Sequence, residues 1–242
     1  MLSSSITKME KIIARGAEAV IIKEGNSVTK NRVEKAYRHP TIDEKIRKLR
    51  TRAEAKLLEK AYKIINVPKL IKSDEQKKTI QLEFIKGKKL AENLEKLDYV
   101  SICKKIGDSL AKLHDNNIIH GDLTTSNMIY VDNNKIKEKN KKHQTSNLII
   151  NDSKSEHERA RGVHEKGKVY FIDFGLGFQS PKVEDKAVDL HLIKQALEAK
   201  HPLVHQKAFK AVLKGYKSSI NQSKVIKQLE AVEKRGRYKA QY

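Results

Sequence analysis

The sequence predicts an α+β chain of two lobes, with a small strand-rich lobe in front and a mainly helical lobe behind it. Three observations lead to this fold class. Short apolar runs alternate with turn residues over 12–33 and again near 67–85, as in antiparallel strands. Between them lies one long segment whose apolar residues recur at helical spacing. From about residue 97 onward, helical patterns dominate outside the segment 132–168 and the strands that flank it.

Residues 1–86 form the predicted N-terminal lobe. The runs "KIIA", "AVII" and "SVTK" are divided by Gly16 and by "EGN", which predicts two or three antiparallel strands. A long helix follows, opened by Pro40, and its apolar face is expected to include Ile42 and Leu49. "VPKLIKS" and "TIQLEFI" flank a polar turn and predict a hairpin.

Residues 87–242 form the predicted C-terminal lobe, which begins at the break marked by Gly87. "LDYVSICKKIGDSLAKLHDNN" predicts a helix whose apolar face includes Val100 and Cys103. "NMIYV" and "KVYFI" predict two strands, and three amphipathic helices are expected after "DFG". The last segment, "EKRGRYKAQY", is basic and aperiodic.

The two strands of this lobe are separated by residues 132–168, which hold ten Lys/Arg and six Asp/Glu. Because this segment has few aliphatic residues outside "NLII", we expect a mostly disordered insertion between two hairpin strands. An inert loop is the favoured interpretation of it.

The chain is strongly basic, with a formal net charge of +21 and a pI near 9.8. Such a surplus favours an anionic partner, namely a nucleic acid, a nucleotide or an acidic protein, although many single lysines only solvate the surface. The excess is largest at the end of the chain, where ten Lys/Arg and two Asp/Glu follow from Lys207 onward.

Cys103 is the single cysteine, which excludes an internal disulfide and favours a reducing compartment. The N-terminus lacks the apolar core of a signal peptide, and no apolar run approaches the roughly 20 residues that span a bilayer. We therefore expect no membrane partner and a cytoplasmic location, with the nucleus as a second location.

Two motifs carry candidate chemistry. "HGDLTTSN" holds Asp122 and Asn127 just after an apolar run, and "FIDFG" holds Asp173 at the end of an apolar strand. Asp122 can accept a hydroxyl proton or orient an attacking group. Carboxylate and amide oxygens such as those of Asp173 and Asn127 are ligands that Mg²⁺ prefers. Either motif alone occurs by chance, but together they predict phosphoryl transfer, which depends on positioning and charge neutralisation.

The same mechanism needs a cation on the phosphates. Lys30 ends "SVTK", where a phosphate-contacting lysine belongs, and Glu54 in the following helix can pair with it. Each alone is one charge among many, so their order in the chain carries the argument. The turn "RGAEA" has one glycine instead of the three of a phosphate-covering loop. The motif itself indicates an ordinary tight turn, although the backbone of Gly16, Ala17 and Glu18 can still approach phosphate.

Taken together, "RGAEA", "YRHP", "EFIKG", "HGDLTTSN", "FIDFGLGF", "EDKAVDL" and "RGR" resemble the PRPK-type kinase subunit of the KEOPS (EKC) complex. The resemblance runs through nearly the whole chain outside the insertion. It implies a minimal bilobal protein-kinase-like fold in which Lys30 contacts phosphate and Glu54 fixes that lysine. It also implies that Asp122 is the catalytic aspartate and that Asn127 and Asp173 hold Mg²⁺.

The same resemblance implies that "LEFI" is the hinge between the lobes, with Glu83, Phe84 and Ile85 around the adenine. It implies an atypical serine/threonine protein kinase with ATPase activity, with ATP and Mg²⁺ as cofactors. KEOPS supports threonylcarbamoylation of the adenosine beside the anticodon of tRNA. The implied partners are the threonylcarbamoyl-transferase subunit, a small activator subunit, and tRNA through the basic surface and a C-terminal tail with Arg235 and Arg237.

The sequence also departs from ordinary protein kinases. Gly121 stands where they have an arginine, and the segment from Gly175 to Glu184 is short and lacks A-P-E, so activation-loop phosphorylation and a peptide-docking groove are not expected.

Two alternative functions remain open. A small-molecule phosphotransferase of the antibiotic or choline kinase type usually needs a larger helical lobe than 176–242 provides. A nonenzymatic tRNA-binding adaptor has no need for a complete metal and phosphate set.

Overall fold

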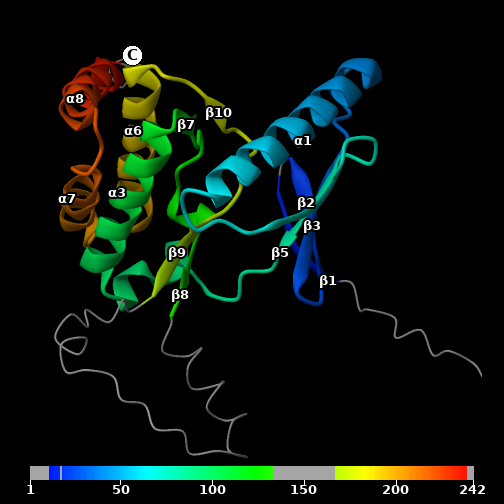
Figure 1. Ribbon diagram of the computed structural model, residues 1–242, viewed down its shortest axis with the longest axis horizontal. Coiled ribbons are helices and arrows are strands. Elements are labelled where there is room, and N and C mark those ends of the chain that lie inside the picture. Colours follow the sequence, from blue (N-terminus) through cyan, green and yellow to red (C-terminus); the bar gives the residue numbers. More distant parts are fainter. Residues whose placement is uncertain (1–10, 17, 133–166, 239–242) are drawn as a thin grey trace, which may run out of the picture.

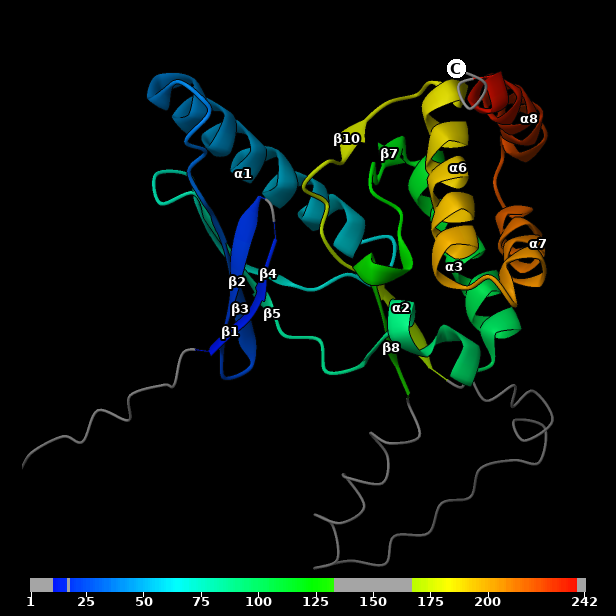
Figure 2. The ribbon, with the colours of Figure 1, turned by 180° about the vertical axis from the view of Figure 1, so that it is seen from behind.

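The structure is a computed structural model that describes residues 11–16, 18–132 and 167–238, with side chains up to Arg235. Figure 1 shows two lobes side by side, one built on a sheet crossed by a long helix and the other built mainly of helices. The view from behind in Figure 2 shows the same division. The predicted α+β architecture of two lobes is confirmed. The insertion expected at 132–168 lies outside the described residues except for its ends.

The N-terminal lobe is an antiparallel sheet of five strands in the order β1-β2-β3-β5-β4. These strands are β1 Lys11–Arg15, β2 Ala19–Glu24, β3 Ser27–Arg32, β4 Leu70–Asp74 and β5 Thr79–Glu83. The strands predicted before the long helix and the hairpin predicted after it are confirmed. Gly25, with a φ of 59°, permits the tight turn that pairs Glu24 with Ser27. β3 is the central strand, so its backbone is held from both sides.

The long helix α1, Pro40–Tyr62, begins at the residue where the sequence predicts it. The prediction of its buried face is wrong in the first half, because Ile42 and Leu49 are 57% and 50% exposed. The physical reason is that the inner face of this half meets charged groups, as in the ion pair of Arg47 with Asp43 at 2.6 Å. The residues buried there are polar, namely Asp43, Arg47, Thr51 and Glu54.

The described part of the C-terminal lobe is mainly helical, with α2 Leu90–Asn93, η1 Leu94–Lys96, α3 Tyr99–Asp115, α6 Val183–Lys200, α7 His205–Tyr216 and α8 Gln222–Tyr238. The three helices expected after "DFG" are confirmed. Val100 is exposed rather than buried, because α3 turns Ile102 and Ile106 inward. The expectation of an aperiodic basic end is also wrong, since α8 continues through "EKRGRY". No helix of the described residues has the length and apolar character needed to cross a membrane.

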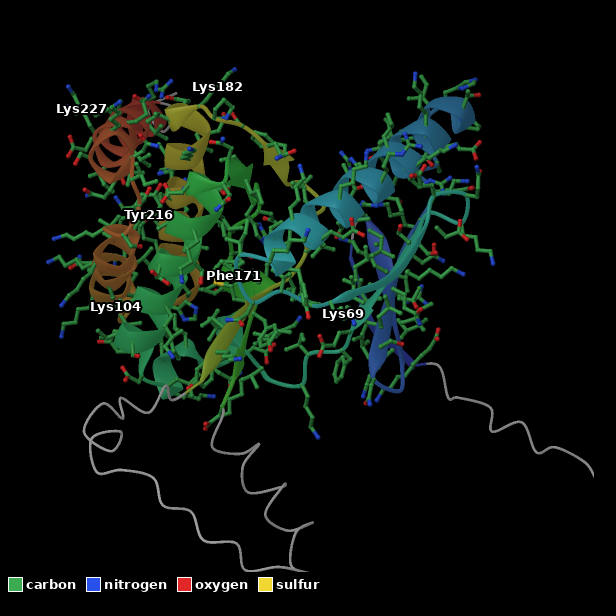
Figure 3. The ribbon with its side chains drawn as sticks, in the orientation of Figure 1. Lys69, Lys104, Phe171, Lys182, Tyr216 and Lys227 are labelled. Atoms are coloured by element: carbon green, nitrogen blue, oxygen red, sulfur yellow. The ribbon has the colours of Figure 1, made fainter. Side chains whose placement is uncertain are left out.

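The helices α3 and α7 cross at two glycines. A methyl group on Gly107 would lie 1.9 Å from the carbonyl oxygen of Val212, and a methyl group on Gly215 would lie 1.9 Å from that of Lys104. Only glycine allows two backbones to approach this closely. Figure 3 labels Lys104 of α3 and Tyr216 of α7, both in the helical lobe. Tyr216 is buried in the core.

Short strands carry the two motifs to the space between the lobes. β8 Met128–Val131 pairs with β9 Lys168–Phe171, and β6 Lys88–Lys89 pairs with β8. β7 Ile118–Ile119 pairs with β10 Phe178–Gln179. The expected pairing of "NMIYV" with "KVYFI" is therefore confirmed. The loops at the ends of β7 and β9 contain "HGDLTTSN" and "DFG", and the short helix η2 Thr125–Asn127 completes the first of them.

Candidate active site

Lys30 on β3 is the cation at the centre of the candidate site. Its Nζ donates to Oε1 of Glu54 at 2.9 Å and to Oδ1 of Asp173 at 2.5 Å. Glu54 comes from α1 and Asp173 from the loop after β9, so three segments far apart in the sequence meet here. The structure thus brings together three of the residues that the sequence selects.

Arg32 joins this cluster, although no motif in the sequence assigns it a role. Its Nη2 donates to Oε2 of Glu54, and both side chains are almost completely buried. Arg32 lies two residues after Lys30 on the same strand, which places both side chains on one face of the sheet. That spacing is the signal that could have identified it.

Asp173 has a φ of 66°, which is uncommon for a residue other than glycine. Its Oδ1 also accepts a hydrogen bond from the Gly175 amide at 3.1 Å. Burial raises the pKa of the Asp173 carboxyl, but the charge and hydrogen bond of Lys30, together with that amide, outweigh burial and lower the pKa below its ordinary 3.8. The side chain is 45% exposed, so an ionised carboxylate faces solvent between the lobes.

Asp122 and Asn127 contact each other within "HGDLTTSN". Nδ2 of Asn127 donates to Oδ2 of Asp122 at 2.8 Å and to its carbonyl oxygen at 3.0 Å. These bonds use the amide hydrogens of Asn127 and leave Oδ1 as a possible cation ligand. The carbonyl oxygen of Asn127 accepts from the Ile172 amide at 2.9 Å, which holds this loop beside the residue that precedes Asp173.

The oxygens of Asp173 and Asn127 fit a magnesium ion. Mg²⁺ prefers hard oxygen ligands, and protein sites often supply only one or two of them while phosphates and water supply the rest. Within residues 11–16, 18–132 and 167–235, no group of three His, Cys, Asp or Glu side chains is arranged to hold a metal. A magnesium site with two oxygen ligands from the protein, Asn127 and Asp173, stays a prediction.

Asp189 of α6 anchors the loop that carries Asp122. Its Oδ2 accepts from the His120 amide at 2.7 Å, and its Oδ1 accepts from the Gly121 amide at 2.9 Å. The Nε2 atom of His114 lies 3.3 Å from the same carboxylate, which is buried. "EDKAVDL" contains Asp189, but sequence alone does not reveal that this aspartate binds backbone amides of a distant loop.

Gly121 shows why the arginine of ordinary protein kinases is missing. Its φ is 77°, a conformation that side chains other than glycine rarely adopt. A methyl group there would lie 2.3 Å from the carbonyl oxygen of Leu176. The loop and the segment after Asp173 are therefore packed too closely for any side chain at this position.

His120 is fully buried beneath Asp122. Its Nδ1 accepts from the Asp122 amide at 3.3 Å, its Nε2 lies 3.2 Å from the Ile172 carbonyl oxygen, and its ring packs on Phe174. Burial lowers the pKa of His120, although the carboxylates of Asp189 and Asp173 oppose this shift. A neutral ring with the proton on Nε2 satisfies both hydrogen bonds, so His120 supports the loop without carrying charge.

The predicted hinge lies at the end of β5. The Glu83 amide donates to the carbonyl oxygen of Lys69, and the Phe84 amide donates to that of Asn26, each at 2.9 Å. Both bonds stay inside the N-terminal lobe. These bonds use the amides of Glu83 and Phe84. The third hinge amide, that of Ile85, is the one that they leave for a nucleobase.

The turn between β1 and β2 contains the residues expected near phosphate. The Gly16 amide donates to the carbonyl oxygen of Ala19 at 2.9 Å, while Ala17 lies outside the described residues. Oε2 of Glu18 accepts from Arg50 of α1 at 2.6 Å. The Glu18 side chain is thus directed to α1, so that only its backbone can contact a phosphate.

The end of α8 contains the arginines expected to approach RNA. Arg235 is exposed and forms an ion pair with Glu184 in the first turn of α6. The side chain of Arg237 lies outside the described residues. The structure therefore gives one of these two cations a partner within the chain.

Comparisons with known proteins identify the family and the fold of the chain. The RIO domain family matches residues 11–137. The Rio2 kinase of Chaetomium thermophilum, solved as its ADP/Mg²⁺-phosphoaspartate complex, superimposes with a TM-score of 0.56 at 16% identity, over 95% of this chain and 70% of that one. This likeness shows the protein-kinase-like fold that the resemblance implies.

Two relatives align with almost the whole chain. The "KEOPS complex subunit Bud32" of Pyrococcus abyssi is 35% identical, over 95% of this chain and 96% of that protein. A "Probable bifunctional tRNA threonylcarbamoyladenosine biosynthesis protein" of Methanobrevibacter smithii is 39% identical over 95% of this chain, which matches 37% of that longer protein. The chain therefore belongs to the RIO domain family and, within it, to the Bud32 family of KEOPS complex subunits.

Proposed function

We propose that this protein is a magnesium-dependent ATP phosphotransferase, a serine/threonine kinase with ATPase activity, that acts as a KEOPS subunit in threonylcarbamoyladenosine modification of tRNA. The observation that carries the catalytic part is the meeting of Lys30, Glu54 and Asp173, with the Asp122–Asn127 pair held beside them. Membership of the Bud32 family supports the role in KEOPS.

Each residue of the site has a role in this proposal. Lys30 places its ammonium group on the nucleotide phosphates, and Glu54 fixes its direction. The Asp173 carboxylate and the Asn127 amide oxygen hold Mg²⁺, which neutralises charge on the phosphates when bound. Asp122 accepts the proton of the attacking hydroxyl group or water. The hinge backbone holds the adenine.

The test is ATP turnover by the full chain, alone and with the transferase subunit, for Asp122→Ala and Asp173→Ala. We expect each substitution to lower turnover at least about 100-fold, as for the loss of one preorganised group that acts in the transition state. Glu75→Ala is the control, because Glu75 pairs with Arg52 at the surface of the N-terminal lobe. Unchanged turnover in both aspartate variants contradicts the enzymatic proposal and favours a nonenzymatic adaptor.

The proposal includes two protein partners, the threonylcarbamoyl-transferase subunit and a small activator subunit. It also includes a cytoplasmic location, with the nucleus as a second one. The partner proposal is tested by mixing the full chain with each purified subunit and measuring the size of the resulting species. Separate elution of the transferase subunit at micromolar concentrations contradicts it.

We infer that RNA contacts α7 in addition to the end of α8. Four exposed lysines, Lys207, Lys210 and Lys214 of α7 and Lys217 just after its last residue, form the α7 lysine stripe. Their spacing places them on one side of the helix over about 15 Å. α7 contains no acidic residue, and none of the four lysines forms an ion pair with a described residue. Cations without such partners, aligned on a rigid helix, suit the phosphates of a nucleic acid backbone.

This surface is tested by replacing all four lysines with glutamine and measuring tRNA affinity at several salt concentrations. If each lysine neutralises one phosphate, the slope of log affinity against log salt should decrease by about 3. The matched control replaces four exposed lysines of the N-terminal lobe, Lys45, Lys56, Lys72 and Lys77, so that the charge change is equal. An equal loss in both variants contradicts a localised RNA surface, and ATP turnover without RNA is expected to stay unchanged.

A further inference from the structure

We propose that Arg32 is a positioning residue for phosphoryl transfer, which retains Glu54 in place when Lys30 turns to the nucleotide phosphates. The inference rests on the proposed function and assigns a role to a residue outside the sequence motifs. It follows from the way in which one buried carboxylate is shared between two cations.

The geometry divides Glu54 evenly between these cations. Its Oε1 accepts from Nζ of Lys30 at 2.9 Å, and its Oε2 accepts from Nη2 of Arg32. The side chains of Arg32 and Glu54 are only 3% and 1% exposed, so water does not replace either partner. Loss of the partner of a buried carboxylate strongly destabilises the folded protein, because the charge is left buried and uncompensated. Glu54 therefore needs one cation that never leaves it.

Lys30 is the cation that has to change partners. In the structure it bridges Glu54 and Asp173, and in the proposed reaction both Lys30 and Asp173 are needed by the nucleotide and its metal. Arg32, by contrast, forms an ion pair with Glu54 and, among the described residues, none with Asp173, although its Nη2 also lies near the turn at Gly175. A methyl group at Gly175 would lie 3.2 Å from Nζ of Lys30 and 3.3 Å from Nη2 of Arg32.

A second observation separates this role from simple stabilisation. Nε of Arg32 is buried and has no hydrogen-bond partner among the described residues. A buried donor without a partner lowers stability, so an apolar side chain or a fully bonded one would stabilise this position better. A charge retained at such a cost indicates a use in the reaction. The shared carboxylate identifies that use as holding Glu54.

The experiment measures kcat and KM for ATP in the full chain for Arg32→Gln, Arg32→Lys, Glu54→Gln and the double variant Arg32→Gln/Glu54→Gln. We expect Arg32→Gln to lower kcat roughly tenfold or more while KM for ATP changes less than about threefold, since charge placement matters most in the transition state. Arg32→Lys keeps the charge and should recover a large part of this loss.

The double variant tests whether Arg32 acts through Glu54. In the Glu54→Gln background, Arg32→Gln should change kcat by less than about twofold, because residues that act as one unit are not additive. Losses that multiply contradict the proposal. The comparison also decides the matter should the single Arg32→Gln chain fail to fold, since the double variant has no unpaired buried charge at this pair.

Arg47→Gln is the matched control. Arg47 is a buried arginine on α1 that pairs with Asp43 and Glu34 and, within the part of the chain that the structure describes, forms no ion pair with Lys30, Glu54 or Asp173. It should lower the urea midpoint of unfolding but leave kcat within about twofold, as expected for loss of a partner in an ion pair outside the site. An equal kcat loss for Arg47→Gln and Arg32→Gln at matched stability overturns the proposal. If Asp122→Ala abolishes turnover and Arg32→Gln leaves it intact, the role of Arg32 fails while the proposed function stands.

Discussion

The two sides of the candidate active site are built from different interactions. On the N-terminal side, Glu54 holds Lys30 and Arg32 through ion pairs between side chains. On the C-terminal side, Asp189 holds the backbone of the loop that carries Asp122. An ion pair can be exchanged for a ligand contact, whereas a backbone tied to a buried carboxylate keeps its shape. The candidate site therefore has an adjustable side that carries the cations and a rigid side that carries Asp122, the aspartate proposed as catalytic.

Removal of the anchor on the rigid side should have the largest effect. Asp189→Ala leaves the buried amide of His120 and the partly buried amide of Gly121 without acceptors, and each unsatisfied group costs about 1–3 kcal/mol when buried. We expect the free energy of unfolding to fall by roughly 3 kcal/mol or more, measured by urea titration, and ATP turnover to be lost. Asp108→Ala on α3 is the control, because Asp108 pairs with Lys112 at the surface. A loss below about 1 kcal/mol for Asp189→Ala contradicts the rigid anchor.

Acid should loosen the rigid side by an intermediate amount. Burial lowers the pKa of His120 and of His201, whose Nε2 lies 3.1 Å from Oγ1 of Thr125 in the same loop. Below the ordinary pKa of 6.5 the unfolded chain gains protons that the folded chain does not, so stability decreases as pH falls from about 7 to 5. The slope for each histidine has an upper limit of about 1.4 kcal/mol per pH unit.

Urea unfolding at pH 7, 6 and 5 measures this dependence. His201→Gln should flatten part of the slope, because it removes one of the two groups. His39→Gln is the matched control, since His39 is exposed and precedes α1. Stability that is constant or increases on acidification contradicts the assignment of neutral buried histidines.

The outer face of α1 should have the smallest effect. Leu49→Gln changes an exposed side chain, so we expect the free energy of unfolding to change by no more than about 0.5 kcal/mol. Leu57→Gln on the same helix replaces a buried side chain and should cost at least about 2 kcal/mol. A large loss for Leu49→Gln supports the apolar face that the helical spacing predicts and contradicts the structure of this helix.

The order of the elements could be predicted from sequence because it depends on local patterns. Alternating apolar runs identify the strands, and helical spacing identifies α3, α7 and α8. The site is different, because its parts come from segments far apart in the chain. Lys30 and Asp173 could be selected through motifs that have a known chemistry. Arg32 and Asp189 could not be assigned roles, because a buried charge in a network looks like a surface charge in the sequence. The polar inner face of α1 was missed for the same reason.

The contact between Lys30 and Asp173 bears on the order in which the proposed ligands would enter the candidate site. Oδ1 of Asp173 cannot bind the Lys30 ammonium group and a divalent cation equally well. A metal ion that arrived alone would have to displace Lys30 from a carboxylate whose charge Lys30 already neutralises. A nucleotide offers Lys30 new anionic partners at the moment when Asp173 is released. Under the proposed function, this contact would favour simultaneous loading of nucleotide and metal over stepwise loading that starts with the ion.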